Sequence, residues 1–202
     1  MKFLVCVDCQ NDFMSQDGSL YNSATAAIRP ALVNRVNKAI EDETEIVICT
    51  LDTHDKYSYK NTLEGKRIQI YHCINGSYGW SLIPELGKIA DEEDFSFFIR
   101  EMASESNFFK EKKNLIVPKT SFTADQLDAI ISLVRDYCGE SIDEIEICGV
   151  CTDICVISNA LFLRSKFPNV RITVNRDLTA GTSDEATAAA IKVMESCLID
   201  II

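Results

Sequence analysis

The cysteine that closes the sequence Gly-Val-Cys-Thr-Asp-Ile-Cys at residues 149–155 is placed for nucleophilic chemistry. Cys155 falls in the first turn of a helix that we expect to begin around Asp153. A thiol there feels the positive end of the helix dipole, which lowers its pKa toward the reactive thiolate. Taken alone, a buried structural cysteine is the commoner explanation, so the interpretation depends on the groups around Cys155.

A thiol nucleophile needs a base, and the usual partner, histidine, is scarce in this chain. The chain has two histidines, His54 and His72, and both belong to another cluster. A carboxylate is therefore the expected base, with a cation to hold the ion pair. Asp8 and Lys119 fit these roles, although singly each could be a turn-forming aspartate or a solvated lysine.

The two histidines lie in a pattern typical of a metal site. Asp52-Thr53-His54 follows an apolar run, and His72 comes later in the chain. One carboxylate and two imidazoles make a three-ligand site with an open position, as in functional zinc sites. Asp-x-His is a weak motif, and the alternative is two unrelated surface histidines. Cys73 is a further ligand candidate by its chemistry.

Apolar runs that alternate with helical patterns must position these groups. The runs are nearly all apolar, which is typical of parallel strands buried on both faces. Their alternation with helices predicts an α/β protein of one domain, residues 1–202, with a three-layer, doubly wound sheet of about six mostly parallel strands flanked by helices. The predicted strands are Phe3–Val7, Glu45–Thr50, Phe95–Ile99, Asn114–Val117, Glu144–Val150, Val170–Val174 and Cys197–Ile202; the predicted helices are Ala27–Ile40, Thr123–Cys138, Asp153–Phe167 and Asp184–Cys197.

The predicted strands end at chemically capable residues. Asp8, Asp52 and Lys119 each stand at the end of a strand, and the segment 149–155 ends another. Ligands of doubly wound sheets bind beyond the carboxyl ends of the strands. We therefore expect these groups to meet at one edge of the sheet.

The chain has nine cysteines, an odd number, so at least one thiol is outside any intramolecular disulfide. No stretch resembles a signal peptide or approaches the ~20 apolar residues of a membrane span, so we expect a cytoplasmic protein with reduced thiols. Cys6 and Cys9 form a C-x-x-C, but Cys6 lies in a strand-like run and not at a helix start, which disfavours a redox role. The cysteines expected to pack in the core are Cys6, Cys49, Cys148 and Cys197.

The charge balance excludes one class of partner. Lys+Arg number 20 and Asp+Glu 31, which gives a formal net charge of −11. An acidic surface repels phosphate backbones and disfavours nucleic-acid binding. Two local patterns lead to structural predictions. Thr123 and Gln126 form a plausible capping box at the start of a predicted helix. The segment Lys88–Lys113 could hold a strand and an excursion used in contacts between subunits.

Three motifs resemble the signatures of the isochorismatase-like cysteine hydrolases, a family that includes nicotinamidases. They are Val-Asp-Cys-Gln-Asn-Asp-Phe at 7–13, Val-Pro-Lys-Thr-Ser-Phe at 117–122 and Gly-Val-Cys-Thr-Asp-Ile-Cys-Val at 149–156. The resemblance covers nearly the whole chain and implies a catalytic triad of Asp8, Lys119 and Cys155. It also implies a cis peptide before Cys151 and an oxyanion hole formed by the backbone N–H groups of Cys151 and Cys155.

The region from Asp52 to Trp80 is similar to the metal-binding region of nicotinamidases, where an Asp and two His bind zinc or a similar divalent ion. This resemblance implies that Asp52, His54 and His72 are the metal ligands and that Cys73 is a bystander. Some nicotinamidases add a glutamate between the two histidines, and Glu64 is our candidate for that role.

The resemblance implies hydrolysis of a small carboxamide, most closely nicotinamide, to the acid and ammonia through a thioacyl-enzyme. Phe13 matches the family's ring-stacking aromatic residue, and Tyr78 and Trp80 are weaker candidates for substrate binding. The chain departs from the usual Asp-Trp-His-Pro of nicotinamidases at Thr53 and Asp55. The alternatives are a hydrolase of another small amide, such as a carbamoyl or pyrazine amide, and a metal-binding homologue without activity. Oligomers are common in the family, so we expect a homo-oligomer.

Overall fold

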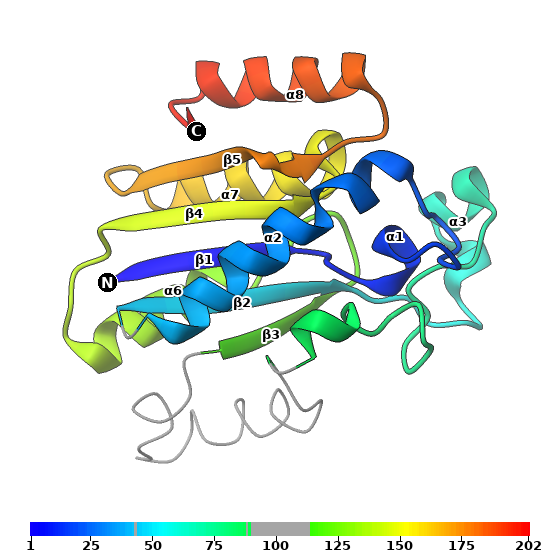
Figure 1. Cartoon of the computed structure of the whole chain (residues 1–202), viewed down its shortest axis with the longest axis horizontal. Coiled ribbons are helices and arrows are strands. Elements are labelled where there is room, and N and C mark those ends of the chain that lie inside the picture. Colours follow the sequence, from blue (N-terminus) through cyan, green and yellow to red (C-terminus); the bar gives the residue numbers. More distant parts are fainter. Residues whose placement is uncertain (43, 88, 90–113) are drawn as a thin grey trace.

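The computed structural model describes residues 1–42, 44–87, 89 and 114–202. It consists of a sheet between two layers of helices (Figure 1). The strands are β1 (Lys2–Val7), β2 (Glu45–Asp52), β3 (Asn114–Lys119), β4 (Glu144–Val150), β5 (Arg171–Ala180) and β6 (Asp200–Ile201). The helices are α1 (Asn11–Met14), α2 (Ser23–Glu41), α3 (Leu63–Ile68), α6 (Leu127–Cys138), α7 (Ile157–Lys166) and α8 (Asp184–Ser196). Short 3₁₀ turns cover Tyr59–Asn61 and Pro84–Leu86, and a π-helical turn covers Thr152–Val156.

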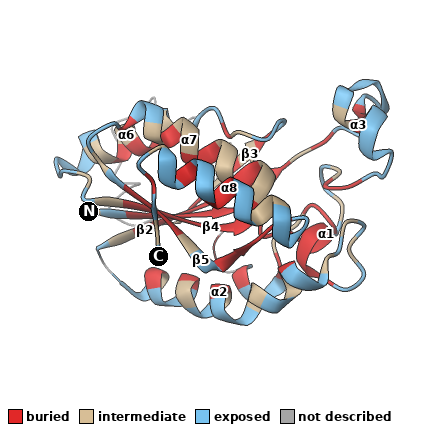
Figure 2. Cartoon of the chain, turned by 90° about the horizontal axis from the view of Figure 1, so that it is seen from above, coloured by how far each residue is buried: buried red, intermediate tan, exposed pale blue. Residues whose placement is uncertain are grey.

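Helices cover both faces of the sheet. Figure 2 shows α2 on one side of the strands and α6, α7 and α8 on the other. The central strands are buried along almost their whole length, with only the first residue of β1, β2 and β4 reaching the surface to any extent. Because these strands are buried on both faces, their sequences are continuous apolar runs. The predicted three-layer α/β fold is confirmed.

The strand order places a crevice beside β1. The six strands described are all parallel and lie in the order β3-β2-β1-β4-β5-β6. The chain builds the sheet outward from β1 to β3, then returns to the other side of β1 for β4. At such a reversal the connections leave in opposite directions, and a crevice opens at the carboxyl ends of the two strands. Asp8 follows β1 there, and Cys151 follows β4.

Gly149 allows β4 to approach β1 closely just before the crevice. It pairs with Val7 and has φ +111°, a conformation that side chains rarely adopt. A Cβ at this position would come 2.1 Å from the carbonyl oxygen of Val7. The peptide bond that follows one residue later, Val150–Cys151, is cis, as the family resemblance implied.

Three helices begin at residues other than the predicted ones. Helix α7 starts at Ile157 instead of Asp153, because Thr152–Val156 forms the π-helical turn. Helix α2 starts one turn early, at Ser23, because the side chain of Asn22 accepts a hydrogen bond from the N–H of Ala24. Helix α6 starts at Leu127, and the Gln126 side chain makes no capping bond. The predicted capping box of Thr123 and Gln126 is therefore wrong: the nearby N–H of Ala124 is satisfied from a distant part of the chain, by the side chain of Asn159.

Of the four cysteines predicted to pack in the core, three are buried there and Cys197 is not. All nine cysteines are free thiols. Cys6 pairs with Cys49 on one side and with Cys148 on the other, and these three thiols are fully buried. Cys197 is only half-buried, because it is the residue at which α8 ends and the chain turns at the surface.

Two predictions concern residues beyond the described part of the chain. The strand Phe95–Ile99 lies outside the described residues, as does nearly all of Lys88–Lys113. At the other end, the predicted strand Cys197–Ile202 shortens to β6, Asp200–Ile201. Of the helices that the structure describes, none combines the length and apolar character that crossing a membrane requires.

Candidate active site

The ammonium group of Lys119 lies between the predicted base and the predicted nucleophile. Lys119 ends β3, Asp8 follows β1, and Cys155 lies in the π-helical turn after β4. The Lys119 Nζ is 2.8 Å from Asp8 Oδ2 and 3.4 Å from Cys155 Sγ. The side chains of Lys119 and Asp8 are both completely buried. The structure thus brings together three residues that are far apart in the sequence.

Burial and mutual charge determine the pKa values of Asp8 and Lys119. Burial raises the pKa of Asp8, and this outweighs the lowering by the neighbouring Lys119 and by the hydroxyl of Thr50, which donates to Asp8 Oδ1 at 2.7 Å. Burial alone would lower the pKa of Lys119, but the negative charge of Asp8 raises it well above its usual value. Lys119 is therefore a permanent cation beside a carboxylate that holds a proton more readily than usual.

The pKa of the Cys155 thiol differs from the value expected from the sequence. Burial raises the pKa of its thiol well above the usual value, and the charge of Asp8 raises it further, while Lys119 lowers it. The predicted lowering toward the thiolate is therefore wrong, because desolvation and the charge of Asp8 together outweigh the lowering by Lys119. A protonated Cys155 needs a base at the moment of attack.

Four potential metal ligands face one another beyond Lys119. They are Asp52, His54, Glu64 and His72, and one ligand atom from each lies within 4.8 Å of all the others. Asp52 ends β2, Glu64 lies in the first turn of α3, and the extended segment after His72 pairs with His54 through the bridge to Ile74. Cys73, the bystander expected from the resemblance, is not in this group.

The geometry of these four side chains fits a bound cation. The Nε2 of His54 is buried without a hydrogen bond, although Asp52 Oδ2 lies 3.0 Å away and Glu64 Oε2 3.8 Å away. The Nε2 of His72 lies 3.4 Å from Asp52 Oδ2 and 3.5 Å from Glu64 Oε1. Two imidazoles and two carboxylates that converge in this way suit zinc and similar divalent ions.

The rest of the His72 ring is held from behind. Its Nδ1 lies 3.1 Å from the carbonyl oxygen of Ile70 and 3.1 Å from the hydroxyl of the buried Tyr59. Partners at the second nitrogen fix the orientation of a ligating histidine and leave the first free for the metal. Tyr59 carried no signal in the sequence, because a buried tyrosine 13 residues before a histidine forms no motif.

Asp52 joins the two clusters. Its Oδ2 faces the histidines, and its Oδ1 is 3.2 Å from Lys119 Nζ. Burial would raise the pKa of Asp52, but the neighbouring rings of His54 and His72 and the charge of Lys119 lower it instead. Asp52 is therefore ionised and serves both groups.

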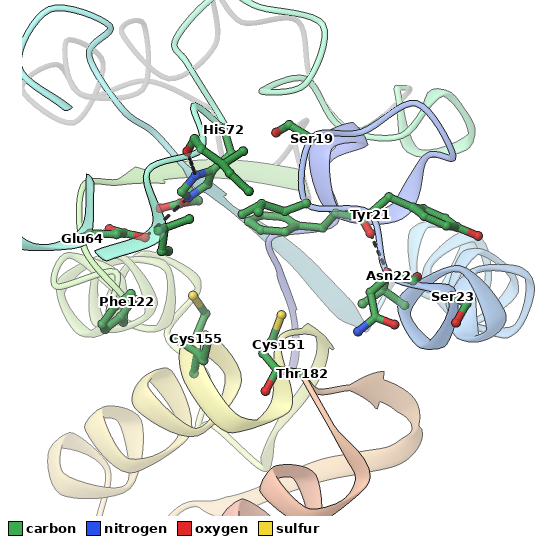
Figure 3. A pocket seen from close by; sticks show the side chains of 17 residues that line it. Ser19, Tyr21, Asn22, Ser23, Glu64, His72, Phe122, Cys151, Cys155 and Thr182 are labelled. Carbon is green, nitrogen blue, oxygen red and sulfur yellow. Dashed lines mark hydrogen bonds and ion pairs between the residues drawn. The ribbon is translucent and has the colours of Figure 1, made fainter. Parts of the chain in front are cut away.

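A cavity of about 850 Å³ opens onto both clusters. Its lining includes Asp52, Glu64 and His72 at the metal group, and Cys155 and Cys151 at the cysteine, all but Asp52 labelled in Figure 3. Phe13, the predicted stacking residue, also lines it.

Tyr78 and Trp80 are not part of the cavity lining among the described residues. Tyr78 is exposed, and its hydroxyl donates to Asp17. Trp80 is buried in the core, and its indole N–H donates to Thr53 Oγ1 at 2.9 Å. The sequence placed both aromatics near the site but not the direction of their side chains.

Sequence reasoning missed most of the opposite wall of the cavity and the supporting residue Gln10. Residues 19–23, Thr25 and Thr182 line the cavity and come from loops and the first turn of α2, where the sequence has no recognisable motif. Gln10 donates to the carbonyl oxygens of Asp52 and Trp80 and accepts from the N–H of Asp52. Gln10 comes three residues after the end of β1, and that position was the available signal.

The profile of the family described as "Isochorismatase domain" matches residues 2–202. The chain belongs to the isochorismatase family. It is an isochorismatase-family hydrolase. Nicotinamidase/pyrazinamidase of Mycobacterium tuberculosis is 27% identical over 206 residues, which cover 100% of this chain and 98% of that relative.

Solved structures of the family share this fold. A pyrazinamidase of Pyrococcus horikoshii in complex with zinc has a TM-score of 0.73 and 21% identity, covering 100% of this chain and 98% of its own. PnC1 from L. infantum in complex with nicotinate has a TM-score of 0.73 and 19% identity, covering 100% of this chain and 92% of its own. The chain is therefore nicotinamidase/pyrazinamidase-like, with a possible metal site at Asp52, His54, Glu64 and His72.

Proposed function

We propose that the protein is a metal-dependent cysteine amidohydrolase that converts nicotinamide and water to nicotinate and ammonia. One observation carries the proposal: the buried Lys119 ammonium contacts Asp8, Cys155 and the metal-cluster residue Asp52 at once. A base, a nucleophile and a metal group that share one cation at the edge of one cavity form a coherent reaction site. The names of the relatives support the same substrate class.

The first half of the reaction forms a thioester. Asp8 accepts the thiol proton while the sulfur of Cys155 attacks the amide carbon, and Lys119 stabilises the charges. The carbonyl electrons move to oxygen, which the backbone N–H groups of Cys151 and Cys155 stabilise. Asp8 then donates its proton to the amide nitrogen as the carbon–nitrogen bond breaks and ammonia leaves.

The second half regenerates the cysteine. Asp8 accepts a proton from water while the water oxygen attacks the thioester carbon. The carbon–sulfur bond breaks, the sulfur regains a proton, and the carboxylic acid is released. The raised pKa of Asp8 suits a group that must both accept and return a proton in one cycle.

Asp52, His54, Glu64 and His72 would hold the metal, and these donor types suit zinc. Bound there, a divalent ion supplies a Lewis-acidic contact for a ring nitrogen of the substrate. Phe13 lines the same cavity and offers an aromatic face for the ring. Pyrazinamide presents the same ring nitrogen and carboxamide, and the name of the mycobacterial relative favours it as a second substrate.

Ammonia release from nicotinamide tests the proposal. The wild-type protein loaded with zinc should release ammonia and nicotinate in equal amounts, and Cys155→Ala should release neither while keeping its fold and zinc content. Turnover by the Cys155→Ala variant would show that the proposed triad of Asp8, Lys119 and Cys155 does not carry out the reaction. Full zinc binding without turnover of any small amide would favour a metal-binding homologue without activity.

A further inference from the structure

The cavity continues well beyond the reacting groups. In Figure 3, Glu64 and His72 lie on one side, Cys155 and Cys151 lie below, and Tyr21, Asn22 and Ser23 lie on the side opposite Glu64. The volume of about 850 Å³ is typical of pockets that enclose drug-sized ligands. A single pyridine ring that reaches from the metal cluster to Cys155 would leave the side of residues 19–23 empty.

The far side of the cavity has a defined wall. The extension compartment, as we call it, is lined by residues 19–23 and Thr182. The Asn22 side chain donates to the carbonyl oxygen of Gly181, and both the N–H and the hydroxyl of Thr182 donate to the carboxylate of Asp153. These bonds attach both sides of the compartment to the loop after β5 and to the turn that carries Cys155.

The same bonds determine what the compartment can recognise. Asn22 also accepts from the N–H of Ala24, so its amide and the Thr182 hydroxyl are already engaged within the protein. Leu20 and Tyr21 contribute apolar surface, and Ser19 and Ser23 contribute small hydroxyls. The charged carboxylates of the lining, Asp52 and Glu64, stand at the metal cluster, and no lysine or arginine lines the described part of the cavity. A neutral, mainly apolar group fits this wall, since an anion would find no cation there.

We propose that the preferred substrates are neutral heteroaromatic carboxamides that carry a second apolar ring or chain, which occupies the extension compartment. This inference rests on the proposed amide hydrolysis and narrows its substrate class. The ring nitrogen and the carboxamide make the same contacts as in nicotinamide, and the added group removes apolar surface from water against Leu20 and Tyr21.

5-Phenylnicotinamide, the bicyclic amide, compared with nicotinamide is the direct test. Both have the ring nitrogen and the carboxamide in the same relation, and the bicyclic amide adds a phenyl ring at the position that is meta to both, away from the metal cluster and Cys155. With zinc-loaded wild-type protein, kcat/KM for the bicyclic amide should exceed that for nicotinamide by about tenfold. An equal or lower value would overturn the inference.

A substitution at the compartment locates the effect. Ser23→Phe fills the space at the start of α2, and the ratio of the two kcat/KM values should fall by about tenfold or more. Ser196→Phe places the same ring at the exposed end of α8, outside the lining, and should leave the ratio unchanged. A ratio that is insensitive to Ser23→Phe would also overturn the inference.

The outcomes separate this inference from the function on which it rests. Hydrolysis of nicotinamide with little hydrolysis of the bicyclic amide would uphold the proposed function and reject the extension compartment. Failure of the zinc-loaded protein on both amides would reject the proposed function itself, and the inference with it.

Discussion

Asp12 and Cys73 are joined by a buried hydrogen bond that spans 61 residues of sequence: the N–H of Cys73 donates to Asp12 Oδ2 at 2.6 Å. The other oxygen of Asp12 accepts from the N–H of Ser19 at 2.9 Å. One carboxylate therefore anchors the residue after His72, a proposed metal ligand, and the beginning of the extension compartment. Asp12 lies in α1, the first helix after β1, which ends at Val7.

Replacing Asp12 should loosen the metal site without touching a ligand. Asp12→Ala leaves the N–H of Cys73 unsatisfied, which should cost about 1–3 kcal/mol of unfolding free energy. Zinc affinity should fall by about 10–100-fold because the segment carrying His72 loses its anchor. Zinc titration and denaturant unfolding measure the two effects. Asp17→Ala, at an exposed position of the next loop, is the control and should change neither.

Lys119 should matter for stability as much as for catalysis. Lys119→Met leaves the buried carboxylates of Asp8 and Asp52 without their cation, which should cost about 3–5 kcal/mol. Adding Asp8→Asn to Lys119→Met should recover part of that loss, since one of the two unpaired charges is removed. Urea unfolding of the single and double variants tests this, and strictly additive losses would speak against the ion pair.

The pH profile should carry the signature of Asp8. Because burial raises its pKa, the carboxyl of Asp8 takes up a proton above the ~3.9 of an ordinary aspartate. The base is active only when ionised, so kcat/KM should fall as the pH drops through that raised value. Carbon-13 NMR of labelled aspartates provides a direct check. Asp143, whose pKa is lowered by its hydrogen bond to the Met1 ammonium, should titrate below Asp8, and the reverse order would contradict the assignment.

The four members of the metal group should not contribute equally. His72→Ala should abolish tight zinc binding, because His72 is almost fully buried and fixed by Tyr59 and Ile70. Glu64→Gln should weaken zinc less, since the Glu64 side chain is 17% exposed and stands farther from the His54 nitrogen than Asp52 does. Competition with a chelator gives the affinities. Cys73→Ala tests the remaining thiol, and loss of zinc in that variant would make Cys73 a ligand after all.

Gly149 offers a purely steric prediction. Gly149→Ala forces a Cβ onto the carbonyl of Val7 and strains a positive φ, which should cost about 3 kcal/mol or more. Gly139→Ala has the strain of φ +65° but open space around the new atom, so about 1–2 kcal/mol is expected. Thermal unfolding of the pair separates contact from conformation. Equal losses would show that the approach of β4 to β1 is not tight.

The sequence predicted the site where the backbone determines position. Asp8, Asp52 and Lys119 meet because parallel strands bring their carboxyl ends to one edge, and apolar runs identify such strands reliably. The pKa of Cys155 could not be predicted, since the helix start is visible in the sequence and the depth of burial is not. Likewise, no pattern indicated that Trp80 would turn toward Thr53, or that Asn22 would cap α2 beside the cavity.

The two oxygens of Asp52 make the halves of the site inseparable under mutation. A change at this position removes a proposed metal ligand and a counter-charge of Lys119 in one step. If the metal is lost in evolution through a change at Asp52, another residue must therefore replace Asp52 as a partner of the buried Lys119 ammonium. Otherwise the fold is lost at the same time. Substitution at His54 or Glu64 leaves both carboxylate partners of Lys119 in place. Metal dependence is therefore lost more easily in evolution through changes at those two positions.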